Sequence, residues 1–300
     1  MAKFQRKLSE YSKPLIKNKI KKLNPVFLPE NDDQADLENQ AIYQSISRLT
    51  GVDRPALVFR TIAASPGALL WCWRRIGPLY ERGLLQEAGW RIGPALHLPS
   101  GLVISQEALD LVNISNDDKL NIVKALDAYN RVNPCNLIAI GVLIRALSSS
   151  GENRCLPAAL GPPNKWIPPK PIIPVTTMVE PEKMSENVSR LIAQISLDQP
   201  SANEPALVPS LYRHLANVPS FLVLASVLLR PLLLQGQLNT LVNEVRAQAM
   251  QESQHLFDMF TARSDDATVN PERMEALFER FSWKIPEMIV VGEILRRALP

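Results

Sequence analysis

Apolar residues recur along most of this 300-residue chain at spacings of three and four, the period of a helix that buries one face. One such set lies between residues 37 and 49, and another lies between residues 188 and 195. Alternation of apolar and polar residues, typical of strands, is scarce, and no two apolar runs are joined by Asn-Gly or Asp-Gly. The pattern therefore predicts an all-α protein.

The helical pattern occurs twice along the chain. The stretch FRTIAASPGALL around Arg60 matches YRHLANVPSFLV around Arg213, 153 residues later. A second pair, NPCNLIAIGVLIRAL at 133–147 and IPEMIVVGEILRRAL at 285–299, matches at an offset of 152 residues. Because a unit of this length is too long for an ordinary solenoid repeat, we predict two tandem homologous helical repeats packed as an intramolecular pseudo-dimer.

Composition divides the chain further. Residues 1–24 carry eight lysines and arginines against one acidic residue, which predicts a basic, solvated N-terminal arm. Seven prolines within residues 151–177 predict an extended linker, so the repeats should span residues 25–150 and 178–300. The apolar content of 46% excludes a disordered chain, and the net charge of only +3 argues against a specific nucleic-acid partner.

Turn residues predict where helices begin and end. Ser65 followed by Pro66 is typical of a helix start, with the serine as N-cap and the proline at the first helical position. Gly83 and its repeat partner Gly236 are typical of the left-handed residue that follows a helix. We therefore expect similar helix boundaries in the two repeats.

The most apolar run, residues 221–234, is too short to cross a bilayer, which requires about 20 apolar residues. We predict a buried helix there and no transmembrane segment. Pro231 in this run and Pro78 at the same place in the first repeat each remove a helical hydrogen bond, so we expect a kink or break at both.

The cysteines Cys72, Cys135 and Cys155 are odd in number and widely separated, which argues against disulfides and thiolate metal sites and favours a cytoplasmic protein. No apolar stretch typical of a secretion signal follows the basic N-terminus. Glu252 and His255 form a Glu-x-x-His, but no second copy accompanies it, so we expect neither a di-iron centre nor any other cofactor.

Several sequence motifs occur in an order that resembles a known protein family. GVDRPALVFRTIAASPGALLWCW, AYNRVNPCNLIAI, a proline-rich crossing and SLYRHLANVPSFL together resemble the group I 2-haloacid dehalogenase family (DehI type), from about residue 25 onward. This family lies within the alkylhydroperoxidase-D-like class. The resemblance implies a duplicated helical fold and hydrolysis of 2-halocarboxylic acids by direct attack of water on the carbon that bears the halogen, without an ester intermediate or a cofactor. It also implies a site between the two repeats.

By position, the resemblance implies that Asn133 corresponds to the family's asparagine that helps to hold the attacking water. It also implies that Ser210 corresponds to a serine of the family's site. The family's catalytic aspartate, just before Tyr212, is replaced by Leu211, which cannot accept a proton. His214, three residues later, is the candidate substitute, because a neutral imidazole can act as a base.

Three further positions fall where the family lines its pocket with aromatic residues, and they hold Arg54, Leu57 and Asn136. Arg54 is a candidate for binding a carboxylate, because arginine matches that group with paired donors. Asn133 has a structural alternative: it precedes Pro134, so it could cap a helix, and a helix N-terminus also attracts anions.

The arginines Arg60 and Arg213 occur in both repeats, which favours structural ion pairs over a role in one asymmetric site.

Two hypotheses about function follow. The first is a site that binds a small carboxylic acid between the repeats, with dehalogenation dependent on a base other than residue 211. The second is a non-catalytic binding or scaffold protein that keeps the fold. A polar cavity near Asn133 with an ionisable group in reach favours the first, whereas a cavity filled by Leu211 and Leu57 favours the second. The sequence leaves open whether the protein forms a homodimer.

Overall fold

The computed structural model describes residues 35–148, 154–155, 166–173, 176–197, 208–262 and 269–300. The described chain is mostly helical, which confirms the predicted class. Its β structure is one antiparallel pair, β1 (Arg154–Cys155) with β2 (Thr261–Ala262), and an isolated bridge between Val52 and Ile172. The predicted basic arm and much of the predicted linker lie outside the described residues.

The helices in chain order are α3 (Leu37–Thr50), α4 (Leu57–Ala63), α5 (Ala68–Glu81), α6 (Leu84–Gly89), α7 (Ile92–Ala95), α8 (Gln106–Leu111), α9 (Asn116–Ser148), the 3-10 helix η4 (Pro181–Lys183), α10 (Glu186–Ile195), α11 (Ser210–Leu215), α12 (Pro219–Leu234), α13 (Gln237–Phe257) and α14 (Pro271–Ala298).

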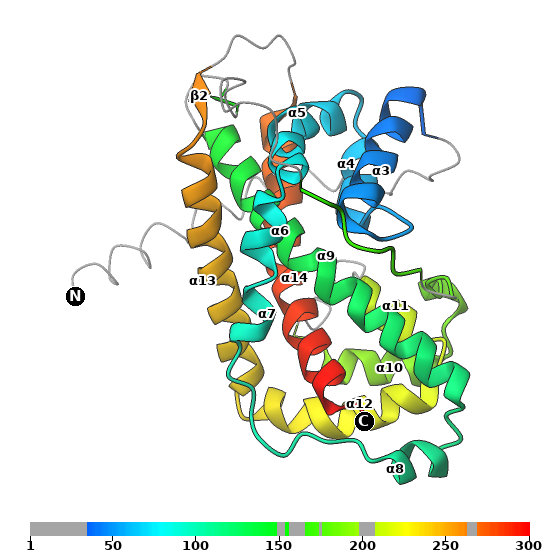
Figure 1. Cartoon of the computed structure of the whole chain (residues 1–300). Helices are drawn as coiled ribbons and strands as arrows, with labels where there is room; N and C mark the ends of the chain where they lie inside the picture. The colour runs from blue at the N-terminus through cyan, green and yellow to red at the C-terminus, as the bar shows by residue number, and fades with distance from the viewer. Residues whose placement is uncertain (1–34, 149–153, 156–165, 174–175, 198–207, 263–268) are drawn as a thin grey trace, which may run out of the picture.

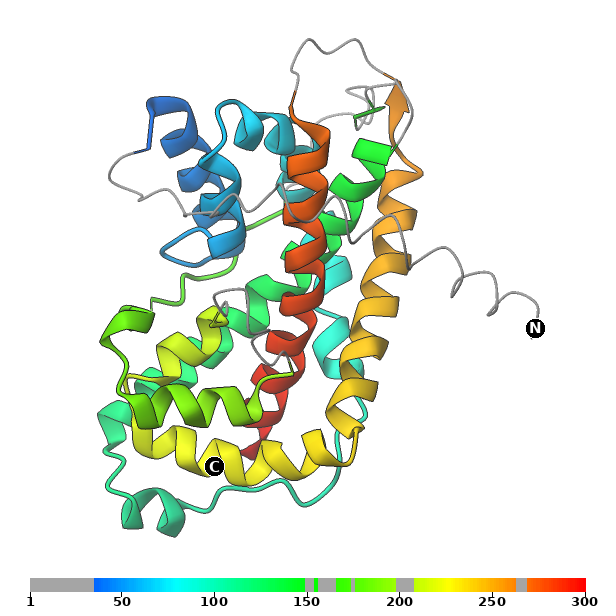
Figure 2. The same cartoon turned by 180° about the vertical axis from the view of Figure 1, so that it is seen from behind.

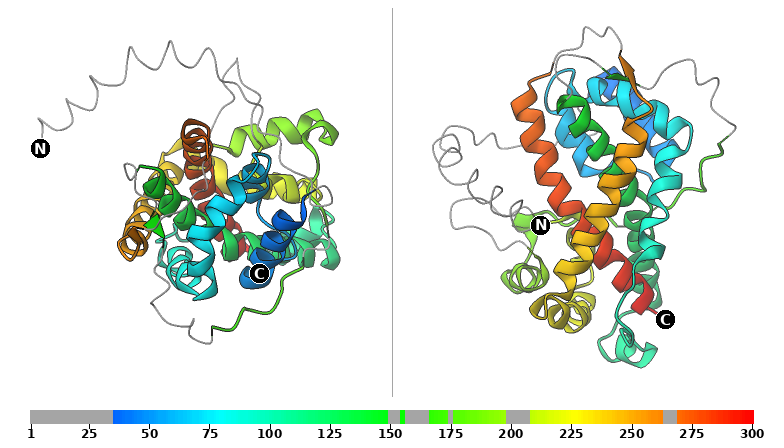
Figure 3. Two further views of the ribbon diagram at one scale, coloured as in Figure 1. Left: turned by 90° about the horizontal axis from the view of Figure 1, so that it is seen from above. Right: turned by 90° about the vertical axis from the view of Figure 1, so that its left-hand side faces the viewer.

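Two long helices, α9 and α14, pack against each other through the centre of the molecule, and α13 packs against both (Figure 1). The helices α3, α4 and α5 lie toward one end of this pair, and α10, α11 and α12 lie toward the other (Figure 2). In the right-hand view of Figure 3, α12 is seen nearly end-on at the foot of α13. Buried apolar side chains from both groups join one large core around the central helices.

Both central helices begin with side-chain caps. Before α9, the Ser115 hydroxyl accepts a hydrogen bond from the Asp118 N–H, and the Asp118 carboxylate accepts one from the Ser115 N–H, each at 3.1 Å. This reciprocal pair is a capping box. Before α14, Asn270 Oδ1 accepts from the Arg273 N–H at 2.9 Å, and Pro271 occupies the first turn, where its missing N–H costs nothing.

Each central helix also contains a proline in its interior, Pro134 in α9 and Pro286 in α14. We expected Asn133 to cap a helix that begins at Pro134, and this expectation is wrong because α9 continues through both residues. An interior proline costs roughly 3 kcal/mol in a helix, but both prolines are buried on helices that pack along each other, and that packing offsets the loss. Asn133 therefore lies on the side of a helix, and the anion site at a helix end does not exist there.

The predicted left-handed glycines are confirmed, and the predicted serine N-cap is not. Gly83 (φ 73°) and Gly236 (φ 74°) both adopt the left-handed conformation between consecutive helices, where a Cβ would be strained. The expectation that Ser65 caps a helix is wrong, because α5 begins at Ala68, directly after the left-handed Gly67 (φ 71°).

The interior prolines of the shorter helices do not break them. α5 continues through Pro78, and α12 continues through Pro231. The sharp turn comes later, at Gly236, where α12 and α13 are bent by 83° to each other. The helix pairs α4 with α11, α5 with α12, and α9 with α14 overlap at the repeat offset, which supports the duplication; the pseudo-dimer stays a prediction.

The apolar run in α12 is only partly buried, in contrast to the prediction. Phe221, Leu222 and Leu229 are buried, but Val227 and Leu234 are 67% and 76% exposed. Among the described residues, no single helix is long and apolar enough to cross a membrane; α12 and α13 reach that length and composition only as a sharply bent pair.

Candidate functional site

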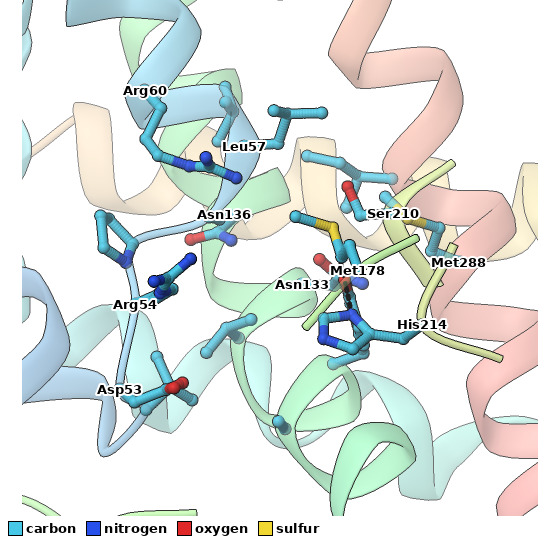
Figure 4. Close-up of a pocket in the computed structure, with 18 of the residues that line it drawn as sticks. Asp53, Arg54, Leu57, Arg60, Asn133, Asn136, Met178, Ser210, His214 and Met288 are labelled. Carbon is cyan, nitrogen blue, oxygen red and sulfur yellow. Dashed lines mark hydrogen bonds between the residues drawn. The ribbon is translucent and has the colours of Figure 1, made fainter. Parts of the chain in front are cut away.

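A cavity of about 210 Å³ lies where α9, α11 and α14 meet the residues at the start of α4 (Figure 4). Six of the seven residues predicted for the site line it, although they come from separate parts of the chain. They are Arg54, Leu57, Asn133, Asn136, Ser210 and His214. The fold thus brings together residues that are up to 160 positions apart in the sequence.

The seventh residue, Leu211, is fully buried and lies outside the cavity lining. Ser210 and His214 are four residues apart on α11, so both side chains lie on the face that meets the cavity. Residue 211 is rotated by about 100° from Ser210 around the helix axis. Leu211 therefore packs into the core and does not fill the cavity.

Two buried amides line the cavity from α9. Asn133 is 3% exposed and Asn136 is 1% exposed. Asn136 Oδ1 accepts a hydrogen bond from the Tyr80 hydroxyl at 3.0 Å, which fixes the orientation of this amide. The Nδ2 groups of both asparagines are buried and have no hydrogen-bond partner within the described structure. A buried donor without a partner costs about 1–3 kcal/mol, so these two groups need an acceptor that the cavity can supply.

Tyr129 is a lining residue that the sequence analysis missed. Its hydroxyl lies 2.8 Å from His214 Nδ1, and the two rings meet edge to face with centroids 5.4 Å apart. Burial lowers the pKa of His214, and burial raises the pKa of Tyr129. The pair is therefore a neutral imidazole hydrogen-bonded to a protonated phenol. Helical spacing could have identified Tyr129 from the sequence, because it lies one turn before Asn133.

Charged side chains lie at one side of the cavity. Figure 4 shows Asp53, Arg54 and Arg60 on the side opposite His214 and Met288. Asp53 was also missed, since nothing in the sequence distinguishes it from a loop carboxylate; its charge raises the pKa of His214 by less than burial lowers it.

The paired arginines of the two repeats have different surroundings. Arg213 forms an ion pair with Glu180 and donates from Nε to the Val179 carbonyl at 3.0 Å, which confirms the structural role predicted for it. Arg60, at the same repeat position, lines the cavity.

The two central helices face the cavity with the same spacing and different chemistry. On each helix three lining residues follow one another at intervals of four and three, and the two sets are related by the 152-residue offset. The set on α9 is Tyr129, Asn133 and Asn136, and the set on α14 is Phe281, Ile285 and Met288. One wall of the cavity therefore offers hydrogen bonds, and the opposite repeat offers an apolar surface.

No group of three or more metal-binding side chains occurs among the residues that the structure describes. Glu252 of the Glu-x-x-His motif forms an ion pair with Arg91 at 3.4 Å. Cys72 and Cys135 are buried free thiols, and burial raises the pKa of Cys135 to about 12, so this thiol stays protonated and is a poor nucleophile.

No family model and no curated protein matches this sequence. Solved structures of D-2-haloacid dehalogenase do match. A mutant in complex with D-2-CPA is 20% identical with a TM-score of 0.70, and a complex with L-LA is 19% identical with a TM-score of 0.68. Each alignment covers 90% of this chain and 95% of the other. The chain therefore has the all-α fold of D-2-haloacid dehalogenase, as the motif order predicted.

Proposed function

We propose that the protein binds a small organic acid in the cavity, with the two repeats packed as an intramolecular pseudo-dimer around it. One observation carries this proposal: Asn133 and Asn136 line the cavity, and their buried Nδ2 groups have no hydrogen-bond partner in the described chain. A carboxylate supplies acceptor oxygens for both, and hydrogen bonds to an ionised acceptor are roughly twice as strong as those between neutral groups.

The charges around the cavity also favour an anion. Among the described residues that line it, Arg54 and Arg60 are basic and Asp53 is acidic. The lowered pKa of His214 keeps the imidazole uncharged at neutral pH, so its contribution is a hydrogen bond and not a charge. The arginines therefore supply the positive potential that draws in an acid, and the amides fix its position.

The alternative, a scaffold that has lost its site, requires a filled cavity. Leu211 packs away from the cavity, and Leu57 leaves it open. We therefore favour binding over a purely structural role.

Hydrolytic dehalogenation is the second candidate function, and His214 is the observation that favours it. In this reaction a water oxygen bonds to the carbon as the carbon–halogen bond breaks, a base takes the water proton, and halide leaves. Leu211 cannot take that proton, whereas the neutral imidazole of His214 lies in the cavity.

Isothermal titration of the full chain with propionate tests binding, with uncharged propionamide as the matched ligand. We expect saturable binding of propionate and at least about tenfold weaker binding of the amide. Asn133→Leu should weaken propionate binding by about 10- to 100-fold, because a hydrogen bond to a charged group is lost. Asn243→Leu, at an exposed position of α13, is the control and should bind as the wild type does. If neither propionate nor a longer straight-chain acid binds, the proposal is refuted.

Halide release from 2-chloropropionate, followed by ion chromatography, separates the two candidates. If binding is the whole function, no halide appears, and Leu211→Asp does not restore release because residue 211 faces away from the cavity. If His214 is a base, halide appears and is lost in His214→Asn.

A further inference from the structure

The cavity joins two surfaces of opposite character, and this asymmetry bears on what kind of acid fits. Asn133 and Asn136 on α9 correspond to Ile285 and Met288 on α14 at the 152-residue offset, and all four line the cavity. A ligand that carried only polar groups would leave the α14 wall in contact with water. A ligand with one charged and one apolar end satisfies both walls.

The same division runs along the length of the cavity. Figure 4 shows Arg54, Arg60 and Asn136 toward one side and the thioether of Met288 toward the other, with Met178 overlapping Asn133 in this view. Thioethers are polarisable and pack well against alkyl chains and ring edges, and they adapt to irregular shapes. Met288, with Phe281 and Ile285 on the same helix, therefore matches the apolar part of a ligand whose carboxylate lies toward the arginines and the amides of α9.

The size of the cavity sets the length of that apolar part. A volume of about 210 Å³ accommodates about 15 water-sized positions, since each needs roughly 10–15 Å³. A two- or three-carbon acid occupies fewer than half of these positions. It would reach the amides and leave the methionine side unfilled.

We infer that the ligand is a monocarboxylate with an unbranched or aryl-ended apolar tail of about four to eight carbons, with its carboxylate at Asn133 and Asn136 and its tail against Met178 and Met288. This inference rests on the proposed function, because it assigns the chemical class of the acid that the same cavity binds.

The test is an isothermal titration series of straight-chain acids from acetate to decanoate against the full chain. Burying one methylene is worth about a three- to fourfold gain in affinity. We expect the dissociation constant to fall by about that factor per carbon beyond propionate and to level off near eight carbons, where the tail reaches solvent. An affinity that does not change with chain length, or that peaks at two or three carbons, would overturn the inference.

Variants of the methionines place the tail. Met178→Gln keeps the length of the side chain and a hydrogen-bond acceptor for Tyr129, whose hydroxyl lies 3.7 Å from the Met178 sulfur. This variant, and independently Met288→Gln, should weaken octanoate binding by about tenfold more than propionate binding. Met184→Gln, beside η4 and outside the cavity lining, is the matched control. Equal losses for both acids would contradict the placement.

The series also separates this inference from the proposed function. If neither propionate nor octanoate binds, the cavity is not an acid site and both proposals fail. If propionate binds and octanoate binds no better, the proposed function stands and the apolar-tail ligand is excluded.

Discussion

The helices α9 and α14 resemble each other in structure, but they differ at the positions that face the cavity. Both are long, both begin with a side-chain cap, and both carry a buried proline at the same repeat position, Pro134 and Pro286. At the positions that face the cavity, however, Asn133 is matched by Ile285. On these two helices the prolines that agree belong to the fold, whereas Asn133 and Ile285, which differ, face the cavity.

Two residues further along each helix, the polar residue belongs to the second repeat instead of the first. Cys135 in α9 is a buried thiol, whereas its partner Glu287 in α14 is a buried carboxylate, 1% exposed. Glu287 accepts hydrogen bonds from the Tyr212 hydroxyl and the Leu197 N–H, each at 3.2 Å, and Lys284 lies 3.8 Å away. The second repeat thus uses a charged residue to tie α14 to α10 and α11, where the first repeat uses apolar packing.

The largest effect is expected at this pair. Glu287→Ala should lower the free energy of unfolding by about 3–5 kcal/mol, because it breaks the buried ion pair with Lys284 and removes the acceptor of the Leu197 N–H. Cys135→Ala, the same truncation in the first repeat, should cost only about 1 kcal/mol, the loss of a small apolar contact. Urea denaturation followed by circular dichroism measures both. Equal losses in the free energy of unfolding would show that Glu287 and Cys135 contribute equally to stability.

The next effect concerns the amide wall. Asn136→Leu makes this position of α9 resemble α14, but it leaves the buried Tyr80 hydroxyl without its acceptor. We expect a loss of about 1–3 kcal/mol in the free energy of unfolding. Adding Tyr80→Phe should recover a large part of that loss, so the double-mutant cycle shows a coupling energy of about 1 kcal/mol or more. Strictly additive losses would mean that the 3.0 Å contact contributes nothing to stability.

Much of the fold could be predicted because its signals are local. Apolar spacing identified helices, and the left-handed Gly83 and Gly236 marked boundaries in both repeats. The local rule for prolines predicts a helix start at Pro134 and a kink or break at Pro78 and Pro231, but all three lie inside continuous helices. Whether a helix tolerates an interior proline depends on the packing of its neighbours, which the local sequence does not contain.

The site was partly predictable for a different reason. Five lining residues were identified from the family resemblance, which carries information about three-dimensional neighbours, and His214 was identified from its spacing to residue 211. Tyr129 was overlooked because an aromatic residue at helical spacing is more often part of a core, and its contact with His214 exists only in the folded chain. Asp53 was overlooked because a loop acid has no local feature that distinguishes it. Leu211 was placed in the cavity by the motif, and only the rotation of α11 shows where it points.

A smaller effect is expected from pH, through His214, which lines the cavity. Burial holds its folded-state pKa below 6.5, so the unfolded chain takes up the proton more readily as the pH falls through that value. The stability that neutral His214 contributes is thus fully present above pH 6.5 and is lost on the acid side. Urea midpoints at pH values of roughly 7.5 and 5.5 should differ less in His214→Gln than in the wild type. His255→Gln, at an exposed position of α13, is the control and should keep the wild-type difference.

The smallest effect is expected where the two central helices meet at the surface. Asp127 in α9 and Arg296 in α14 form an ion pair at 2.7 Å, with both side chains 39% exposed. The residue of the first repeat that corresponds to Arg296 is Ile144, which is uncharged, so it cannot form the equivalent ion pair with α14. Solvent screens such a contact, and Asp127→Asn should cost less than about 1 kcal/mol in urea denaturation. The cost should shrink further in about 1 M NaCl. A larger, salt-independent loss would show that this one-sided contact, and not the shared apolar core, holds the repeats together.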